Sequence, residues 1–257
     1  MHANQRERLI VELLETRGFV SFQELDEKLD ASAATIRRDL ERMARAGVLT
    51  RVRGGAKLIA AAAAPPQLAG VPFHENVGRN AAQKRAIGRA AAALCRPGEA
   101  VMIDGGSTTL QMCPHLAGLN LQVLTNSLHI VSALLPQPAT RILVPAGSVF
   151  REQNIILSAS GEESMHRFHA PRLFMGAAAL GPQGLMQADV VLVASERRLI
   201  ERADEIIVLA DSSKFTGPSG HVVCPLEDIA VVVTDAGVPD AARRMLDAAG
   251  VRLMVAA

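Results

Sequence analysis

Tryptophan and tyrosine are absent from the sequence, and only seven phenylalanines occur among its 257 residues. Alanine, valine, leucine and isoleucine must therefore fill the core. This composition suits helices packed on buried parallel strands better than an antiparallel sandwich. Apolar residues make up 49% of the chain and charged residues 21%, which excludes global disorder. The length allows one large domain, or a small domain followed by a medium one.

Cysteine is also scarce. The three cysteines, Cys95, Cys113 and Cys224, lie far apart and are odd in number, so we expect no disulfide framework. Their pattern is typical of a protein in the reducing cytoplasm. The opening residues are charged rather than apolar, so we expect no signal peptide. Residues 105–140 contain no Asp, Glu, Lys or Arg, but prolines and asparagines interrupt them, which argues against a membrane span. We expect a soluble, cytoplasmic protein.

Neither sign of charge is in excess over the whole chain, since the formal net charge is +1. The charge is nevertheless uneven: residues 37–57 carry seven basic and two acidic side chains, whereas residues 1–36 carry four basic and seven acidic ones. An uncharged run rich in alanine and proline follows at 59–72, and it has the composition of a linker. We therefore divide the chain into a first domain at residues 1–58, a linker at 59–75 and a second domain at 76–257.

Three helix starts are visible in the first domain. Ser21 and Glu24 have the spacing of an N-cap and its reciprocal carboxylate, and the same pattern begins at Asn4. Ser32 is placed to cap a third helix, which Gly47 would end. The apolar faces of these helices would consist of Leu9, Ile10, Leu13, Leu14, Phe22, Leu25, Leu29, Ile36, Leu40, Met43 and Ala44. Three short helices with so small a core are typical of a helix-turn-helix module.

The third helix separates apolar from charged side chains. Opposite its apolar face, at about 100° per residue, lie Ala34, Arg37, Arg38, Glu41 and Arg45. A capped helix with a cationic face is suited to the major groove of DNA, where arginine pairs bidentately with guanine or phosphate. The alternative is an ordinary solvated face rich in arginine. Beyond this helix, Arg51, Arg53 and Lys57 flank a Gly-Gly turn, an arrangement that favours a basic wing in contact with phosphates or the minor groove.

These residues resemble the N-terminal signature of the DeoR family of bacterial transcriptional regulators. The matching positions are Arg6, Ile10, Leu14, Ser32, the run Thr35–Leu40 and the segment Gly47–Ala56. Arg53 departs mildly, since many members carry histidine there. The resemblance implies a winged helix-turn-helix domain that binds operator DNA. We expect its DNA contacts to come from Ser32, Ala34, Thr35, Arg37, Arg38, Glu41, Arg42, Arg45, Arg51, Arg53 and Lys57.

Short apolar runs alternate with helix-like stretches in the second domain. The predicted strands are residues 100–103, 122–125, 141–144, 173–175, 205–210, 229–234 and 251–255. The predicted helices are residues 81–95, 127–135, 189–203 and 239–249. This alternation argues for an α/β layer with a mainly parallel sheet, in which ligands bind at the carboxyl ends of the strands.

Small or polar residues follow four of the predicted strands. Asp104–Thr109 reads DGGSTT, whose glycines allow close approach and whose amides and hydroxyls suit a phosphate or carboxylate. Thr125 and Asn126 follow the next strand, Gly176 follows a later one, and Lys214 comes soon after another. Each has a plainer interpretation as a glycine turn, a helix cap or a surface lysine. Because all four recur at the carboxyl end of a strand, we favour one shared anion site.

The second domain is similar to the sensor domain of the DeoR family along nearly its full length. The matching segments are residues 84–87, 104–109, 125–127, 174–177, 184–185 and 210–215. That domain resembles ribose-5-phosphate isomerase in fold, and the family binds phosphorylated sugars or their derivatives. The resemblance implies an effector site built from Asp104, Gly105, Gly106, Ser107, Thr108, Thr109, Thr125, Asn126, Gly176 and Lys214. The chain departs from the family pattern at two places, so the identity of the sugar stays open. Ala178 stands where many members carry an acidic residue, and the stretch around Glu196 differs from the pattern common in the family. In these two departures the chain is similar to the subgroup of the family that controls sugar-acid use, such as L-ascorbate pathways.

We therefore expect a DNA-binding regulator, a repressor of a carbohydrate or sugar-acid operon that a phosphorylated sugar metabolite relieves. Its expected partners are operator DNA, a phosphorylated sugar or sugar-acid effector, and further copies of the chain in a dimer or tetramer. We expect no cofactor, no metal and no membrane partner. The alternative is a sugar-phosphate isomerase-like enzyme tethered to DNA, for which Asp104, Glu196 and Asp211 are the acids available to move a proton beside a carbonyl. Because the sequence contains no evident catalytic set, we expect a regulator and not an enzyme.

Overall fold

The chain divides into two compact units, residues 1–67 and 68–257, in a computed structural model. The structure describes residues 6–7, 9–11, 13–14, 19–29, 31–45, 49–52, 54–58, 73–157, 168–217 and 220–256. Of the predicted linker, residues 59–75, the described part begins at Phe73. There the chain forms a short helix, α4 (Phe73–Asn76), because the buried Phe73 ring stacks on His129 of the second unit, with the ring centroids 4.0 Å apart.

The first unit combines short helices with a three-stranded antiparallel sheet. Helical residues occur at 6–7, 9–11 and 13–14, and they are followed by β1 (Phe19–Ser21), α2 (Phe22–Lys28), α3 (Ala33–Arg45), β2 (Leu49–Val52) and β3 (Gly55–Leu58). The strand order is β1-β3-β2. Ser21 caps α2 as predicted, since its Oγ accepts from the Glu24 N–H at 3.1 Å. The core contains Ile10, Leu14, Val20, Leu25, Leu29, Ile36, Leu40, Met43, Leu49 and Ala56.

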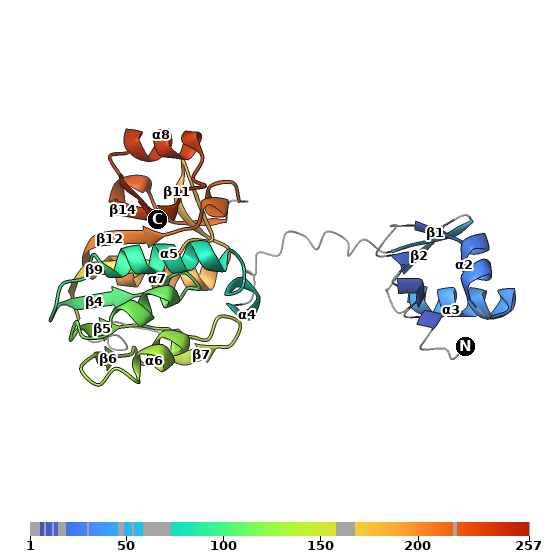
Figure 1. Cartoon of the computed structure of the whole chain (residues 1–257), viewed down its shortest axis with the longest axis horizontal. Helices are drawn as coiled ribbons and strands as arrows, with labels where there is room; N and C mark the ends of the chain where they lie inside the picture. The colour runs from blue at the N-terminus through green and yellow to red at the C-terminus, as the bar shows by residue number, and fades with distance from the viewer. Residues whose placement is uncertain are drawn as a thin grey trace. The chain divides into compact units, whose positions relative to one another are not determined.

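A seven-stranded sheet forms the centre of the second unit (Figure 1). Its order is β15 (Arg252–Ala256), β14 (Ile229–Asp235), β12 (Ala203–Leu209), β9 (Ala170–Met175), β4 (Ala100–Ile103), β5 (Gln122–Leu124) and β6 (Arg141–Leu143). All of its strand pairs are parallel. The carboxyl ends of all seven strands therefore lie along one edge, as the alternation of apolar runs and helices predicts.

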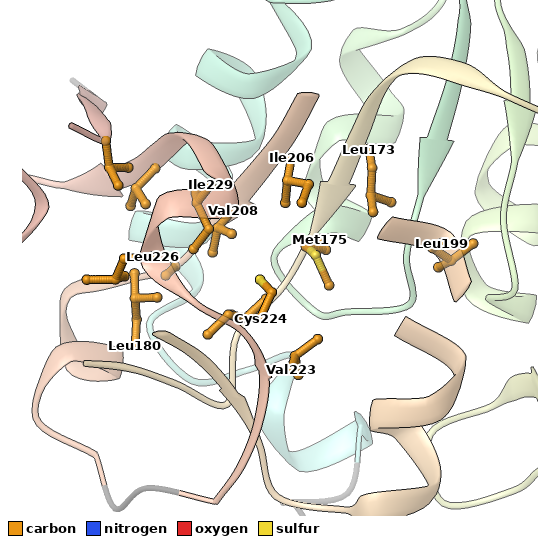
Figure 2. Close-up of a cluster of buried hydrophobic side chains, with 14 of the residues drawn as sticks. Leu173, Met175, Leu180, Leu199, Ile206, Val208, Val223, Cys224, Leu226 and Ile229 are labelled. Atoms are coloured by element: carbon orange, nitrogen blue, oxygen red, sulfur yellow. The ribbon is translucent and has the colours of Figure 1, made fainter. Parts of the chain in front are cut away.

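Side chains along the strands alternate between two cores. Met102, Leu173 and Val208 pack with α7 (Val190–Ile200), α8 (Asp240–Ala248) and a small antiparallel sheet of β10 (Ala179–Gly181), β11 (Gly184–Gln187) and β13 (His221–Cys224). Figure 2 shows this cluster, in which Leu180, Val223 and Cys224 from the small sheet meet the strands. Ile103 and Phe174 face the other core, under α5 (Ala81–Ala92), η1 (Thr109–His115) and α6 (Leu128–Leu134). The sheet is buried on both faces, which explains its continuous apolar strands.

Three features of the second unit were not predicted. The small sheet is one, because its strands contain glycine and lack a clear period-two pattern. The hairpin of β7 (Ser148–Phe150) and β8 (Ile155–Leu157) is another. The segment after the DGGSTT loop is a 3₁₀ helix that contains Pro114. Proline lacks the N–H that an α-helix needs in its interior.

The cysteines and the helices bear on the expected cellular setting. All three cysteines are free and buried. Burial raises the pKa of each thiol to about 12, so these side chains are chemically quiet core residues. Within the described part of the chain, we find no helix with the length and apolar character needed to cross a membrane.

Candidate functional site

The helix α3 presents one charged face. Its start is fixed by Ser32, whose Oγ accepts from the Thr35 N–H at 3.3 Å and lies 2.9 Å from the Thr35 hydroxyl. Ile36, Leu40 and Met43 are buried, as the periodicity predicts. The exposed side comprises Ala34, Arg37, Arg38, Glu41 and Arg42. The cationic face is therefore open to a large, negatively charged partner such as DNA.

The arginines of this face differ in their surroundings. The Arg37 guanidinium lies over the Phe22 ring, 5.2 Å from its centroid, which braces it without neutralising it. Arg42 instead donates to Asp39 at 2.9 Å and lies 2.5 Å from Glu7. Its predicted role in binding DNA therefore competes with a role in holding the helices together.

Asp39 is the buried anchor of this unit. Its carboxylate accepts from Arg6 Nε at 2.7 Å, in addition to the bond from Arg42. Arg6 therefore connects the first helical segment to α3 through a largely buried ion pair. This contact gives a physical reason for two positions of the predicted signature, because a buried carboxylate needs a paired cation.

The predicted wing is the hairpin of β2 and β3. Arg51 is exposed in β2 opposite Ala56, and Gly54 adopts a φ of +89°, which favours glycine at the turn. Arg53 lies outside the described residues, and Arg45 and Lys57 are described for the backbone alone. Arg51 is therefore the predicted wing cation whose exposure the structure establishes.

In the second unit, the DGGSTT loop leaves β4 at the carboxyl edge of the sheet. Thr109 closes the loop, since its hydroxyl donates to the Asp104 carbonyl at 2.8 Å and to the Gly106 carbonyl at 3.0 Å. Within the described residues, no acceptor meets the N–H groups of Gly106, Ser107, Thr108 and Thr109. Four neighbouring N–H groups without acceptors at the start of a helix, here called the nest, are suited to an anion.

Asn126 orders the start of this loop. Its Nδ2 donates to the Asp104 carboxyl at 3.0 Å, and its Oδ1 accepts from the Gly105 N–H at 3.0 Å. The Gly105 amide is therefore occupied, so the anion-binding role predicted for it cannot come from its N–H in this arrangement. Ser127 caps α6 through the Ile130 N–H at 3.3 Å. Asn126 thus connects two of the predicted loops.

Lys84 is a polar residue near this loop that the sequence analysis did not include in the effector site. It is 1% exposed, and its Nζ donates to Ser107 Oγ at 2.9 Å and to the Asn76 carbonyl at 2.5 Å. Burial lowers its pKa to about 8, and the nearby Asp211 carboxylate opposes that effect. A buried lysine that contacts the anion loop is a strong candidate to bind phosphate. Its sequence segment matched the sensor domain, but its spacing alone did not connect it to the loop.

Asp211 lies on the same side of the strand edge as Lys84. One of its carboxylate oxygens accepts from Asn80 Nδ2 at 2.9 Å and also from the Ser213 side chain. The other oxygen, Oδ2, is buried without a partner among the described residues. Lys214 is half-buried in the 3₁₀ helix η3 (Ser212–Phe215), which follows Asp211 after β12. Such an oxygen is available to a ligand donor.

Gly176 and Gly106 bring two loops close together. A Cβ built on Gly106 would lie 3.0 Å from Thr109 Oγ1 and 3.8 Å from the Gly176 Cα. The two loops therefore approach to van der Waals contact at these predicted glycines. Thr125 is fully buried, and its Oγ1 accepts from the Ser127 N–H at 3.2 Å, so its side chain supports the loop.

Asp104 and Glu196 form a second polar group at this edge. Burial raises the pKa of Asp104 to about 6, although its bond from Asn126 opposes the change. Burial also raises the pKa of Glu196 well above its usual value, and the negative charge of Asp104 adds to that shift. Gln187 Nε2 donates to Glu196 at 2.6 Å. Two carboxyl groups from distant parts of the chain thus share a buried environment.

Two family models match this chain: the DeoR-like helix-turn-helix domain over residues 6–62 and the DeoR C terminal sensor domain over residues 79–236. The chain belongs to the DeoR family. The HTH-type transcriptional regulator UlaR of Escherichia coli O127:H6 is 30% identical to this DeoR-family chain, over 97% of it and 98% of the relative. UlaR of Shigella dysenteriae serotype 1 is 29% identical over the same shares.

Solved structures are more distant from this DeoR-family member. Ribose 5-phosphate isomerase A of Methanocaldococcus jannaschii matches with a TM-score of 0.40 and 15% identity, over 53% of this chain and 55% of that one. A probable sor operon regulator of Shigella flexneri matches with a TM-score of 0.42 and 12% identity, over 66% and 91%. Similarities at these TM-scores say nothing about the function of this chain. The predicted family, the fold class and the assignment as a DNA-binding transcriptional regulator are confirmed by the two family models and the relatives.

Proposed function

We propose that this DeoR-family regulator is a repressor of a carbohydrate or sugar-acid operon and that a phosphorylated metabolite releases it from operator DNA. The observation that carries the proposal is the nest of four N–H groups without acceptors in the DGGSTT loop, contacted by the buried Lys84. A phosphate group supplies the acceptors and the negative charge that this arrangement lacks. By linkage, an effector that binds better to a conformation with low DNA affinity shifts the chain toward that conformation and thereby weakens DNA binding.

The effector site consists of the loop Asp104–Thr109, Thr125, Asn126, Gly176 and Lys214, as the resemblance implies, with Lys84 and Asp211 added. Lys84 and Lys214 balance the phosphate charge. The unpartnered Asp211 oxygen accepts from an effector hydroxyl. Each charge-assisted hydrogen bond contributes roughly 1.5–3 kcal/mol, so a free sugar should bind far more weakly than its phosphate.

Lys84 offers a physical route from the effector to the rest of the chain. Its ammonium is shared between Ser107 in the anion loop and the Asn76 carbonyl at the end of α4. The helix α4 begins inside the predicted linker and is the first described element of the second unit. A bound phosphate draws the ammonium toward the loop, and this weakens its bond to α4.

The proposed assembly is a dimer or a tetramer. One small winged helix-turn-helix covers too few base pairs for specificity in a genome, so such modules pair across half-sites. We expect light scattering at micromolar concentration to give a mass of at least twice 27.2 kDa, with or without DNA. A single-chain mass under both conditions would contradict the assembly.

The enzyme alternative rests on the buried carboxyl groups of Asp104 and Glu196. Burial raises the pKa of both groups, and a raised pKa makes an ionised carboxylate a better base, so these two groups alone do not decide against an enzyme. Ala178 leaves the loop after β9 without an acidic side chain. We therefore favour a regulator, and incubation with sugar phosphates should give no turnover by NMR.

Calorimetry tests the proposed function directly. The full chain is titrated with sugars, sugar acids and their phosphates, and each ligand that binds is added to a complex with an operator selected from random DNA. The proposal requires that a phosphorylated ligand binds and weakens the DNA complex, while its free form does neither. Equal binding of phosphorylated and free forms would contradict it.

A further inference from the structure

The helix α6 is apolar on two opposite faces. Ile130 and Leu134 are fully buried in the core that α6 shares with α5 and η1. At about 100° per residue, Leu128, Val131 and Leu135 lie on the opposite face. The exposed fraction is 37% for Leu128 and 69% for Leu135, the C-cap residue. A helix that is apolar on all sides is normally buried on all sides, so this outer face calls for a further packing partner.

The outer face of α6 belongs to a stretch of chain without charge. Residues 105–140 contain no Asp, Glu, Lys or Arg, although these four types make up 21% of the chain. The 3₁₀ helix η1 packs beside α6, and Gln137 connects the two, since its Nε2 donates to the Cys113 carbonyl at 2.7 Å. We call the outward residues of α6 the α6 face: Leu128, Val131, Ser132 and Leu135. It contains one hydroxyl group and no ionisable side chain.

Other helices of the second unit present charge to the solvent. The exposed side of α5 includes Arg85 and Arg89, four residues apart on one face. The exposed valines of α7, Val190 and Val191, share their helix with the exposed Arg197. A surface that meets an identical surface across a two-fold axis must be complementary to itself. Like charges oppose such a contact, whereas an uncharged apolar surface satisfies it, so the α6 face is suited to a second copy of the chain.

The α6 face also adjoins the proposed effector site. The helix α6 begins at Ser127, whose Oγ accepts from the Ile130 N–H at 3.3 Å. Asn126, one residue earlier, holds Asp104 and Gly105 at the start of the anion loop. A contact between two copies through α6 therefore lies next to the segment that orders this loop. Leu128 and Leu135 themselves are exposed and form no part of the site.

We propose that the α6 face binds the α6 face of a second copy and forms the dimer contact of the second unit. This inference rests on the proposed function, from which it takes the assembly, and it names the surface that forms that assembly. The contact is isologous, so each copy contributes the same residues. Its driving force is the removal of Leu128, Val131 and Leu135 from water.

Sedimentation velocity on the full chain tests the contact. The parent at micromolar concentration should have a mass of at least twice 27.2 kDa. Leu135→Glu places one negative charge from each copy in the contact, and it should raise the dissociation constant at least about thirtyfold. Leu128→Glu makes the same change at the other end of α6 and should act in the same direction. Both variants should therefore have a lower mass than the parent at the same concentration.

Val190→Glu is the matched control, because Val190 is 60% exposed on α7 and the change adds the same charge to an exposed apolar position. Its mass should equal that of the parent. Circular dichroism should show that all three variants remain folded, since each substituted side chain is exposed. Loss of folded structure in both leucine variants would contradict the inference, because these side chains would then belong to the core of a single copy.

The remaining outcomes separate the contact from the assembly. If the parent is an oligomer and both leucine variants keep its mass, or if Val190→Glu lowers the mass as much as they do, the α6 face is not the contact and the proposed assembly stands. A parent with the mass of a single chain contradicts the assembly and this inference together. In neither case is the binding of a phosphorylated effector affected, since calorimetry measures it separately.

Discussion

The helix α3 of the first unit and the strand edge of the second unit use charge in opposite ways. The helix exposes Arg37 and Arg38 to solvent, whereas the strand edge buries Asp104, Lys84 and Glu196. Exposed charges contribute little to stability and act over a distance that salt shortens. Buried charges oppose folding until a ligand pairs with them. The comparison predicts that changes to Arg37 and Arg38 alter DNA binding alone, while changes to the strand edge alter both ligand response and stability.

The largest expected effect comes from Gly106→Val. A Cβ at this position already lies 3.0 Å from Thr109 Oγ1 and 3.8 Å from the Gly176 Cα, so the two further methyl groups crowd the loop and displace it. We expect the effector response to be lost while DNA binding is retained, as measured by fluorescence anisotropy with a selected operator. Gly78→Val is the control, because a Cβ there meets only the Glu75 carbonyl oxygen at 4.0 Å. An undiminished response in Gly106→Val would contradict the site.

Loss of the exposed arginines should come next. Arg37→Ala and Arg38→Ala should each weaken operator binding by roughly 1–3 kcal/mol if the side chain pairs with a base, and should reduce the salt dependence if it contacts phosphate. The effector affinity and the melting temperature should not change. Gel-shift titrations at several salt concentrations measure both effects, with the exposed Arg96 of the second unit changed to Ala as the control. Parent-like binding by both variants would show that α3 is not the recognition helix.

Asp104→Asn should stabilise the chain at neutral and basic pH. The folded-state pKa of about 6 exceeds the ordinary value of 3.8, so the folded state binds the proton more tightly and loses stability as pH rises between these values. Well above pH 6 the loss is complete and is on the order of 3 kcal/mol. Urea unfolding should therefore give a more stable variant at pH 8 and little difference near pH 4. If the variant is less stable than the parent at pH 8, the buried charge of Asp104 does not destabilise the folded state as we predict.

The smallest expected effect is that of Arg42→Ala. Arg42 is exposed on the same helix as Arg37, but it is held by Glu7 and Asp39. We expect a smaller loss of operator affinity than in Arg37→Ala and a loss of stability below about 1 kcal/mol, as is usual for exposed ion pairs. The same gel shifts and urea titrations measure both quantities. If Arg42→Ala weakens operator binding more than Arg37→Ala does, Arg42 and not Arg37 makes the stronger contact with DNA.

The two regions also differ in how far the sequence predicts them. The faces of α3 follow from local periodicity, and the predicted cap at Ser32 and core at Ile36, Leu40 and Met43 are confirmed. The strands of the sheet, and the single edge at which their carboxyl ends lie, follow equally well from alternating apolar runs. The family and the class of regulator could be predicted as well, because the signature positions are close together in the sequence.

The individual contacts at the strand edge could not be predicted. Asn80 and Asp211 are 131 residues apart, and Lys84 and Ser107 are 23 apart. Such pairs depend on how helices cross the sheet, which no local pattern encodes. Glu196 is a similar case: it occupies an inward position of α7, but only the fold places it near Asp104. The small sheet was missed for the same reason, since β11 pairs with β13 across an intervening helix.

The most direct measurement is release of operator DNA by matched ligands that differ only in the phosphate. The full chain is bound to a fluorescent operator duplex selected from random DNA. Sugars and sugar alcohols of four to six carbons are then added in parallel with their phosphates, with inorganic phosphate as a further control. We predict that at least one phosphorylated ligand lowers the anisotropy at concentrations where its free form and inorganic phosphate do not. Release by the free form at the same concentration, or no release by any phosphorylated ligand, would contradict a phosphate-binding sensor.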